Sequence, residues 1–370
     1  MPNDTFTIDG QTWPRPGFGA MGLSAFYGKT NFEEAQHTLR AAIKSCGTPR
    51  MSGTDLGSSA DSSYGFGKNE ELISSILASD PELRKKVFLV SKWGLRWGSS
   101  IPGGFKVDGS PEYFEQAIEA SIKRLGFTPD AYLLHRVDSQ TDIEESIRAM
   151  DKARKAGKFK YLGVSECSAA TLRKISKITK IDFIEVECEL GRTSADDRPF
   201  LASGADQILH LAVHLADSLW TLDMERNGVL ETCKELGVLV NAYSPLGRGF
   251  LTGRYKTAAD FKNDEDWRAS LPRLQEEVFE QNYKIVEEIE KIAQRKGCTK
   301  GQLALAWLLA QGDNIIPIPG TKSEKYLLEN FASRKIELTD EEVKELRTIA
   351  EKHAPVGTRY QESGMGTLEG

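Results

Sequence analysis

The sequence predicts an α/β protein with the (β/α)8, or TIM, barrel fold in a single domain, residues 1–370. Short apolar runs alternate with amphipathic segments along the chain, which is typical of strand–helix units and a parallel sheet. Eight such runs can be counted, the number that closes a barrel. Polar residues lie near the C-terminal ends of six of them, where barrel enzymes keep their active sites. An open, doubly wound sheet is the alternative that the same pattern allows.

Composition narrows the class of protein. The chain is 39% hydrophobic and 28% charged, so it can bury a large core, and its net charge of −6 argues against nucleic-acid or anionic-membrane partners, which need a basic face. The sequence contains no run of eighteen consecutive apolar residues, so no membrane span is predicted. The first residues do not resemble a secretory signal. Five widely spaced cysteines favour free thiols in a reducing cytoplasm. We expect a cytoplasmic monomer or weak oligomer.

Six predicted strands share a short apolar run that ends in polar residues or glycine: 87–93, 130–135, 160–166, 182–188, 238–244 and 314–320. Because helical patterns separate them, the strands should run parallel. The first two strands of a barrel are expected in "FGAMGLS" (18–24) and in the region 47–55.

Helices are predicted from amphipathic patterns and their end signals. The clearest patterns cover residues 69–79, 111–126, 142–158 and 227–237. Pro111 stands at a first helical turn, and Gly126, Gly157 and Gly237 stand just past helix ends, which is the usual distribution of these residues.

Two segments interrupt the alternation. Residues 45–63 are small and polar where an apolar strand is expected, and residues 191–219 join a strand to a helix over an unusually long distance. Long connections of this kind are lids, binding loops or disordered segments.

The sequence contains a glycine pattern of dinucleotide-binding proteins and a histidine pair with metal-ligand spacing, but neither has the flanking residues that its function requires. "GFGAMG" (17–22) fits the glycine spacing of a dinucleotide fingerprint, but no clean strand precedes it and no helix opens at its third glycine. A glycine-rich strand and turn facing a ligand is favoured instead. His210 and His214 have a metal-ligand spacing, but Leu211 replaces the glutamate of a metalloprotease and no third ligand is evident, so no metal site is predicted.

Polar residues at the predicted strand ends are the candidate site: Lys92, His135, Ser165, Glu185, Ser244 and Gly320. A lysine that ends a buried strand must reach solvent or pair with an acid. His135 ends the apolar strand "AYLLH" and is predicted to face the rim, although a structural histidine fits the pattern as well.

Six motifs in order carry a family resemblance: "YGFGKNEE", "VSKWG", "YLLHRVD", "YLGVSECS", "AYSPLGRGFLTG" and "IIPIPGTKSEKYLLEN". From about Phe18 to His353 the chain resembles the aldo-keto reductases, in particular the microbial and fungal branch with pyridoxal reductases and related aldehyde reductases. The resemblance implies a barrel that binds NADPH in an extended pose and reduces a small aldehyde or ketone.

The resemblance also implies catalytic roles. Tyr64 matches the general acid; because a free phenol has a pKa near ~10, its anion needs stabilisation, and Lys92 matches the lysine that supplies it. His135 matches the histidine that orients the carbonyl. The family's aspartate, which pairs with the lysine, stands five residues before the tyrosine, where this chain has Ser59. Asp55 is the preferred candidate, Asp61 is the alternative, and a missing partner is the third possibility.

Cofactor contacts follow from the same motifs. Ser165 and Glu185 match residues at the nicotinamide carboxamide, although many family members have glutamine where Glu185 stands, and Glu166 follows where asparagine is frequent. Tyr243 matches the ring that stacks on nicotinamide. The remaining predicted contacts are Ala20 and Met21 in the glycine-rich turn, Ser244, Leu246, Arg248 and Gly249 around the pyrophosphate, and Gly320, Thr321, Lys322, Glu329 and Asn330 at the adenosine phosphate. A lysine at this last position favours NADPH over NADH.

Three alternatives stay open. The displaced aspartate motivates a cofactor-binding barrel with little or no turnover, and the loss of an apolar second strand could prevent stable folding. The segment 191–219 is either a lid over the cofactor or extra coding sequence such as an unspliced intron, the favoured hypothesis, and only this second origin is also proposed for the region 45–63.

Overall fold

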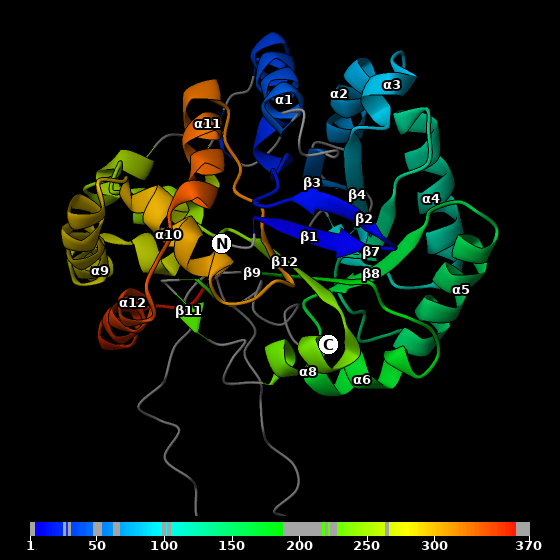
Figure 1. Ribbon diagram of the computed structural model, residues 1–370. Helices are drawn as coiled ribbons and strands as arrows, with labels where there is room; N and C mark the ends of the chain where they lie inside the picture. Colours follow the sequence, from blue (N-terminus) through cyan, green and yellow to red (C-terminus); the bar gives the residue numbers. More distant parts are fainter. Residues whose placement is uncertain are drawn as a thin grey trace, which may run out of the picture.

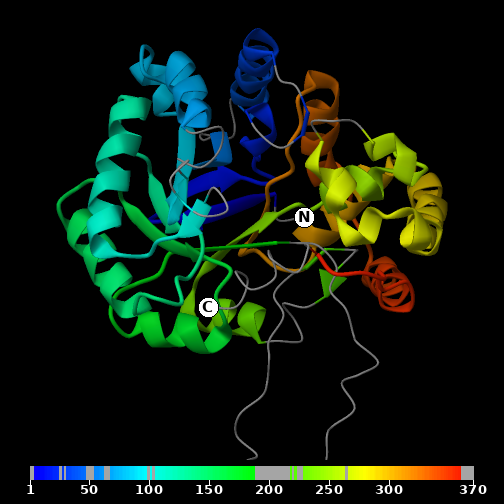
Figure 2. The same cartoon turned by 180° about the vertical axis from the view of Figure 1, so that it is seen from behind.

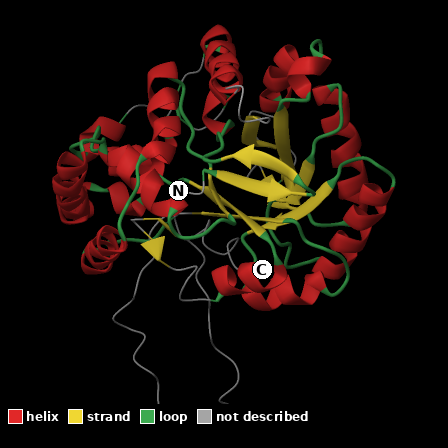
Figure 3. Cartoon of the chain, in the orientation of Figure 1, coloured by secondary structure: helices red, strands yellow, loops and turns green. Residues whose placement is uncertain are grey.

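The structure of the protein is a computed structural model (Figure 1). It describes residues 4–24, 27–28, 31–46, 54–61, 67–97, 101, 105–187, 217–218, 221–222, 228–262 and 266–359, with the backbone alone over 54–61. Within these residues, strands lie in the middle of the molecule and helices surround them (Figure 3).

A parallel sheet of seven strands forms the barrel wall, in the order β13-β12-β9-β8-β7-β4-β3. The strands are β3 (Thr54–Asp61), β4 (Val87–Trp93), β7 (Ala131–Leu134), β8 (Tyr161–Ser165), β9 (Phe183–Glu187), β12 (Leu239–Tyr243) and β13 (Ile315–Pro317). Except for β3, they fall within the predicted runs to within three residues. Strands β4, β7, β8, β9 and β13 are wholly buried, as expected when helices cover one face of a parallel sheet and the barrel interior the other.

The eighth position of the barrel is taken by the glycine-rich segment 17–20. Its backbone hydrogen bonds run from Gly17 N to Pro317 O (2.8 Å) and from Gly19 N to Pro319 O (3.2 Å), next to β13. The short helix η1 (Met21–Leu23) follows and contacts β3 on the other side. The predicted strand 18–24 is therefore half right: its first residues pair with β13 and its second half is helical. This segment and the seven strands complete a (β/α)8 barrel.

The irregular second strand keeps its place in the wall through a register shift. β3 pairs with β4 from Thr54 opposite Val87, and the register shifts between Leu56 and Ala60. Strand bulges of this kind accommodate extra residues without ending the pairing. The strand thus begins near the end of the predicted region 47–55 and extends past it.

Helices form an outer ring around the strands (Figure 1). They are α1 (Phe32–Cys46), α2 (Lys68–Leu77), α3 (Pro81–Arg84), α4 (Pro111–Leu125), α5 (Ile143–Lys155), α6 (Ala169–Ser176), α8 (Val229–Leu236), α9 (Glu276–Lys296), α10 (Lys300–Leu309), α11 (Glu324–Ala332) and α12 (Asp340–Lys352). Short 3-10 helices are η3 (Gly247–Thr252), η4 (Ala258–Phe261), η5 (Trp267–Ser270), η6 (Pro272–Leu274) and η7 (Ser333–Lys335). Two-stranded pairs are β5 (Leu95–Trp97) with β6 (Phe105–Val107), and β10 (Asp217–Ser218) with β11 (Thr221–Leu222).

Helix α4 shows why the end signals in the sequence work. The Ser110 side chain accepts a hydrogen bond from the Tyr113 backbone N–H, and Pro111 occupies the first turn, where its missing N–H costs nothing. Gly126 ends the helix at a φ of 78°, a left-handed conformation that glycine adopts without a Cβ clash. The predicted boundaries of this helix are confirmed.

A hairpin closes the N-terminal end of the barrel. β1 (Thr5–Ile8) and β2 (Gln11–Pro14) lie across the end facing the viewer in Figure 1, and Figure 2 shows the molecule from the opposite side. Trp13 packs edge-on against Phe88 of β4, with ring centroids 5.3 Å apart, inside an aromatic cluster within the barrel. Because this end is filled, a ligand has access only from the opposite rim.

In the part of the chain that the structure describes, no helix is both long and apolar enough to cross a bilayer.

Candidate active site

The centre of the candidate site is an ion pair across the barrel interior. Lys92, at the end of β4, is 1% exposed, and its Nζ donates a hydrogen bond to Oε1 of Glu185 on β9, which is 2% exposed. Strands β7 and β8 lie between β4 and β9 in the sheet, so the two side chains meet across the lumen. The expectation that this buried lysine pairs with an acid is confirmed, and the acid is one that sequence motifs assigned to the cofactor.

Alternation along β4 orients Lys92. Its neighbour Ser91 faces outward, where the Ser91 Oγ donates to Oε1 of Glu70 on α2 at 2.7 Å. Glu70 is fully buried and also accepts from Nε of Arg124 on α4 at 2.6 Å. Since successive strand residues point to opposite faces, Lys92 faces the interior.

The same contacts fix the start of α2, the helix that follows Tyr64 in sequence. Asn69, in its first turn, donates to the Ala20 backbone oxygen at 2.9 Å and to the Ser24 Oγ at 2.8 Å. Helix α2 is thereby anchored to the glycine-rich segment, and through Glu70 to β4. Tyr64 itself lies outside the described residues.

His135 directly follows β7, beside Lys92. It is buried, and its backbone N–H donates to the Trp93 carbonyl at 2.7 Å, which holds it level with the end of β4. Trp93 points the other way, packing on Phe114 of α4 with centroids 4.9 Å apart. His135 thus lies at a strand end, as predicted, while the prediction that its imidazole faces the rim and its catalytic role stay predictions.

The predicted aspartate candidates occupy different levels of β3. The register places Asp61 opposite Lys92, and Asp55 opposite Phe88, which precedes Lys92 by four residues in β4. Their side chains lie outside the described part of the chain.

A second charged cluster lies at the ends of β8 and β9. Glu166 and Glu187 are both fully buried, and the hydroxyl of Tyr243 donates to Glu166 Oε1 (3.0 Å) and lies 3.2 Å from Glu187 Oε2. Arg248 donates to Glu187 Oε1. Arg359, beyond α12 and 6% exposed, places Nη1 3.6 Å from Glu166 Oε2 and 3.8 Å from Glu187 Oε2. Two carboxylates and two guanidinium groups therefore neutralise one another.

Burial and neighbouring arginines have opposite effects on the pKa of Glu166 in this cluster. Burial raises the pKa of its carboxyl above the ordinary value, and Arg359 and Arg136 oppose that rise. Glu166 also adopts a positive φ of 51°, and its Oε1 accepts from the Glu187 backbone N–H at 2.7 Å. A backbone strained in this way aims its side chain back into the barrel.

The loop after β12 bends sharply around an arginine. Ser244 and Arg248 have positive φ angles of 51° and 54°, and Gly249 one of 95°. Arg268 holds this loop from outside, donating from Nη1 to the Arg248 carbonyl at 2.8 Å while its Nη2 pairs with Asp266 at 2.6 Å. Leu246 is buried in the same turn. Such a turn presents successive backbone groups to one side, as anion-binding loops do.

The segment after β13 packs tightly on the glycine-rich turn. A Cβ on Gly320 would lie 2.8 Å from the Gly19 carbonyl, which excludes any side chain there. Nearby, Nζ of Lys322 donates to the backbone oxygens of Tyr27 (2.8 Å) and Gly28 (2.9 Å). Lys322 thus ties the segment after β13 to the backbone at 27–28, and its role at the adenosine phosphate stays a prediction.

The remaining predicted contacts come from several different elements. The Thr321 Oγ1 accepts from Ser323 N at 3.1 Å, and the Glu329 Oε1 accepts from the Thr299 hydroxyl at 2.8 Å. Asn330 is buried in α11, Ser165 is buried at the end of β8, and Met21 opens η1.

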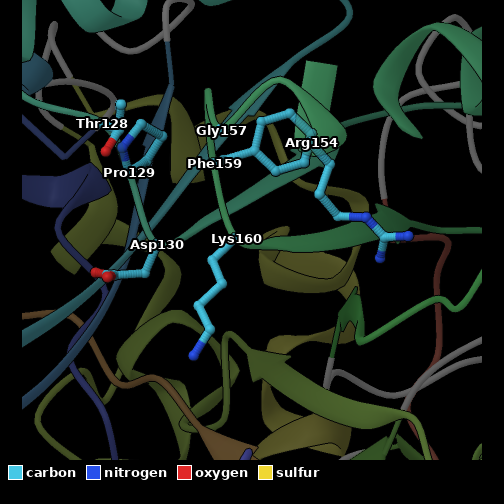
Figure 4. A pocket seen from close by; sticks show the side chains of 7 residues that line it. All are labelled: Thr128, Pro129, Asp130, Arg154, Gly157, Phe159 and Lys160. Atoms are coloured by element: carbon cyan, nitrogen blue, oxygen red, sulfur yellow. The ribbon is translucent and has the colours of Figure 1, made fainter. Parts of the chain in front are cut away.

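A hollow on the opposite face is not a competing site (Figure 4). Its lining comes from the loops that precede β7 and β8 and from the last turn of α5: Thr128, Pro129, Asp130, Arg154, Gly157, Phe159 and Lys160. Asp130 there accepts from Arg84 Nη2 at 2.8 Å and from the Leu89 backbone N–H at 2.7 Å, contacts that bind neighbouring elements together. Residues at this end of a barrel serve stability.

Among the described residues, no group of histidine, cysteine, aspartate and glutamate could hold a metal. His210 and His214 lie outside the described part, as does most of the segment 191–219. Glu187, Arg268 and Arg359 belong to the site but were not predicted from the sequence motifs. Only Arg268, close to the acidic "NDED" run, carried any local signal, because its partner Asp266 lies two residues before it.

Comparison with known proteins connects this geometry to a family. A sequence profile of the Aldo/keto reductase family matches residues 17–204 and 210–351. The chain is 40% identical over 363 residues to aldo-keto reductase yakc of Schizosaccharomyces pombe, whose name specifies NADP(+), covering 97% of this chain and 95% of that protein. It is 39% identical over 358 residues to an aldo-keto reductase of Gibberella moniliformis, covering 96% of each.

Solved structures show the same fold. A glycerol dehydrogenase from Gluconobacter oxydans superposes with a TM-score of 0.76 at 25% identity, covering 97% of this chain and 98% of the other. A thermostable aldo-keto reductase solved with the inhibitor epalrestat gives a TM-score of 0.64 at 25% identity, covering 93% and 98%.

Proposed function

Because this chain belongs to the aldo/keto reductase family of NADP-dependent oxidoreductases, we propose that it reduces an aldehyde or ketone to an alcohol, with Tyr64 as the proton donor. The observation that carries the proposal is the buried Lys92, paired in the barrel interior at the end of β4. β4 lies beside β3, the strand that precedes Tyr64 in the chain.

Proton transfer is the part of the reaction that the protein's side chains perform. A phenol with a pKa near ~10 is a weak donor at neutral pH, and a nearby ammonium group stabilises the phenolate that remains after donation. Lys92 supplies that charge. His135, held level with the end of β4, orients the carbonyl oxygen toward the donor. When bound, NADPH supplies the hydride for the carbonyl carbon.

The residues at the rim fit the cofactor. Glu185 Oε2, Glu166 Oε2 and Asn241 Nδ2 are buried and have no hydrogen-bond partner among the described residues. Burying such atoms is costly unless a ligand or water satisfies them, and a nicotinamide carboxamide has both a donor and an acceptor to offer. We assign the carboxamide to Glu185 and Ser165, and the adenosine phosphate to Lys322.

Backbone register favours Asp61 over Asp55 as an additional carboxylate near Lys92. Asp61 stands opposite Lys92 in the β3–β4 ladder, whereas Asp55 stands opposite Phe88, in the aromatic cluster that fills the closed end. A carboxylate at the second position would lie far from the catalytic rim. The choice between the two remains a prediction.

The test is NADPH oxidation, followed at 340 nm, with pyridoxal and with substituted benzaldehydes. The proposed function predicts substrate-dependent oxidation by the wild-type protein and formation of the matching alcohol. An NADPH fluorescence change without any carbonyl-dependent oxidation would instead support the second candidate, a cofactor-binding barrel without turnover. That alternative is motivated by Ser59, which stands at the family's aspartate position.

A further inference from the structure

The partner of Lys92 in the barrel interior is a glutamate from the opposite wall. Glu185 lies on β9, separated from β4 by the two strands β7 and β8, and its Oε1 accepts a hydrogen bond from Lys92 Nζ. Gly163 of β8 lies between them in register, opposite both Leu133 and Phe183. A Cβ there would lie 2.7 Å from Leu133 Cγ, so this wall has no room for a larger residue.

Burial makes the charge state of each side chain depend on its partner. The two side chains are 1% and 2% exposed, so neither charge is solvated by bulk water. A buried lysine without an anion loses its proton, because burial disfavours the charged form. A buried ion pair whose partner is removed leaves one charge uncompensated, which is strongly unfavourable.

We propose that Glu185 is a positioning residue for proton transfer: its carboxylate pairs with Lys92 in the barrel interior and keeps the ammonium group charged. The inference rests on the proposed function, since it concerns the same site. Glu185 Oε1 accepts the hydrogen bond from Lys92, and Glu185 Oε2 has no hydrogen-bond partner among the described residues. One carboxylate can therefore hold the lysine and accept from the nicotinamide carboxamide at the same time.

The other charged groups near Lys92 come from the neighbouring strand ends. His135 follows β7, and Asp61 stands at the matching register position on β3. Glu166 and Glu187, on β8 and β9, already contact Tyr243 and the arginines of the second cluster. Asp61 is thus the competing carboxylate, and the experiment must separate it from Glu185.

The first measurement is the pH dependence of kcat/KM for carbonyl reduction. Glu185→Gln keeps the shape and the hydrogen-bond acceptor but removes the charge, so Lys92 should lose its proton at lower pH. We expect the basic limb of the profile to move down by at least about one pH unit. Glu185→Asp, which keeps the charge, should leave that limb near its wild-type position. A limb unchanged in Glu185→Gln, or one displaced only by Asp61→Asn, would overturn the proposal.

The second measurement needs no activity. Urea unfolding of the cofactor-free protein is compared for wild type, Lys92→Met, Glu185→Gln and the double variant. Each single variant should unfold at lower urea, because each removes one member of the buried ion pair, and the double variant should be more stable than Lys92→Met. Additive losses would contradict the pairing. A wild type that reduces no carbonyl would refute the proposed function, yet the unfolding cycle would still report on the ion pair.

Discussion

Replacing Arg359 by methionine should destabilise the protein far more than an ordinary surface change. Arg359 lies 3.6 Å and 3.8 Å from the carboxylates of Glu166 and Glu187, both fully buried. At about 4 Å, two unit charges attract by roughly 4 kcal/mol at an effective dielectric constant of about 20. Removing one member of a buried charge cluster typically costs about 3–5 kcal/mol, because a carboxylate is left unpaired. We expect a loss in that range near pH 8.

The loss should depend on pH in a definite direction. Burial already raises the pKa of Glu166 in the folded protein, and Arg359 opposes that rise, so Arg359→Met raises it further. A carboxyl whose folded pKa is raised favours the folded state at acidic pH and loses that advantage as pH rises through the folded pKa. The deficit of Arg359→Met relative to wild type should therefore be largest near pH 8 and shrink near pH 5. Urea unfolding followed by circular dichroism at both pH values measures it.

A matched control comes from an exposed ion pair. Arg295 contacts Glu345 at 2.6 Å, a shorter distance, but its side chain is 58% exposed. Because water screens such pairs, Arg295→Met should cost far less stability than Arg359→Met at either pH. Equal losses in Arg359→Met and Arg295→Met, or a deficit for Arg359→Met that grows toward acid, would refute the assignment of a buried charge cluster.

Three further outcomes follow from the geometry. Gly320→Ala should weaken NADPH binding in fluorescence titration and lower the unfolding midpoint, because its Cβ would lie 2.8 Å from the Gly19 carbonyl; an unchanged dissociation constant would contradict this contact. Lys322→Met should reduce the preference for NADPH over NADH by roughly 10- to 100-fold in kcat/KM, the value of a charge-assisted contact, and an unaltered ratio would remove Lys322 from the phosphate site. Burial raises the pKa of Cys233 to about 12, so peptide mapping after brief iodoacetamide treatment should find the half-buried Cys298 labelled before Cys233; earlier labelling of Cys233 would contradict its burial.

Most of the barrel could be predicted from the sequence, because most of its strands are short apolar runs with clear ends. The run at 87–93 is apolar on both faces and ends in lysine, so its bounds match β4 at both ends. β3 could not be placed in the same way. Its residues are small and polar, and its position depends on pairing with β4 through a register shift that no local pattern reveals.

The candidate site was predictable in its residues but not in its pairings. Motifs located Lys92 and Glu185 separately. The two residues are 93 positions apart in sequence, and they meet across the lumen only because the sheet closes into a barrel. Arg359 was missed because its surrounding residues, "PVGTRY", look like an ordinary tail. Its backbone course is set by contacts with η6 and α9, where Arg273 Nε donates to the Gly357 carbonyl at 3.0 Å and Asn282 binds Val356.

The most direct test of the proposed function is a single-turnover comparison of wild type with Tyr64→Phe. Enzyme saturated with NADPH is mixed with a reactive aldehyde, and the loss of NADPH absorbance is followed in a stopped-flow instrument, with NADPH affinity measured separately by fluorescence. A proton donor contributes roughly 10²- to 10⁴-fold, so Tyr64→Phe should bind NADPH normally but turn over slower by that factor. Equal single-turnover rates for the two proteins would contradict the assignment of Tyr64 as the proton donor.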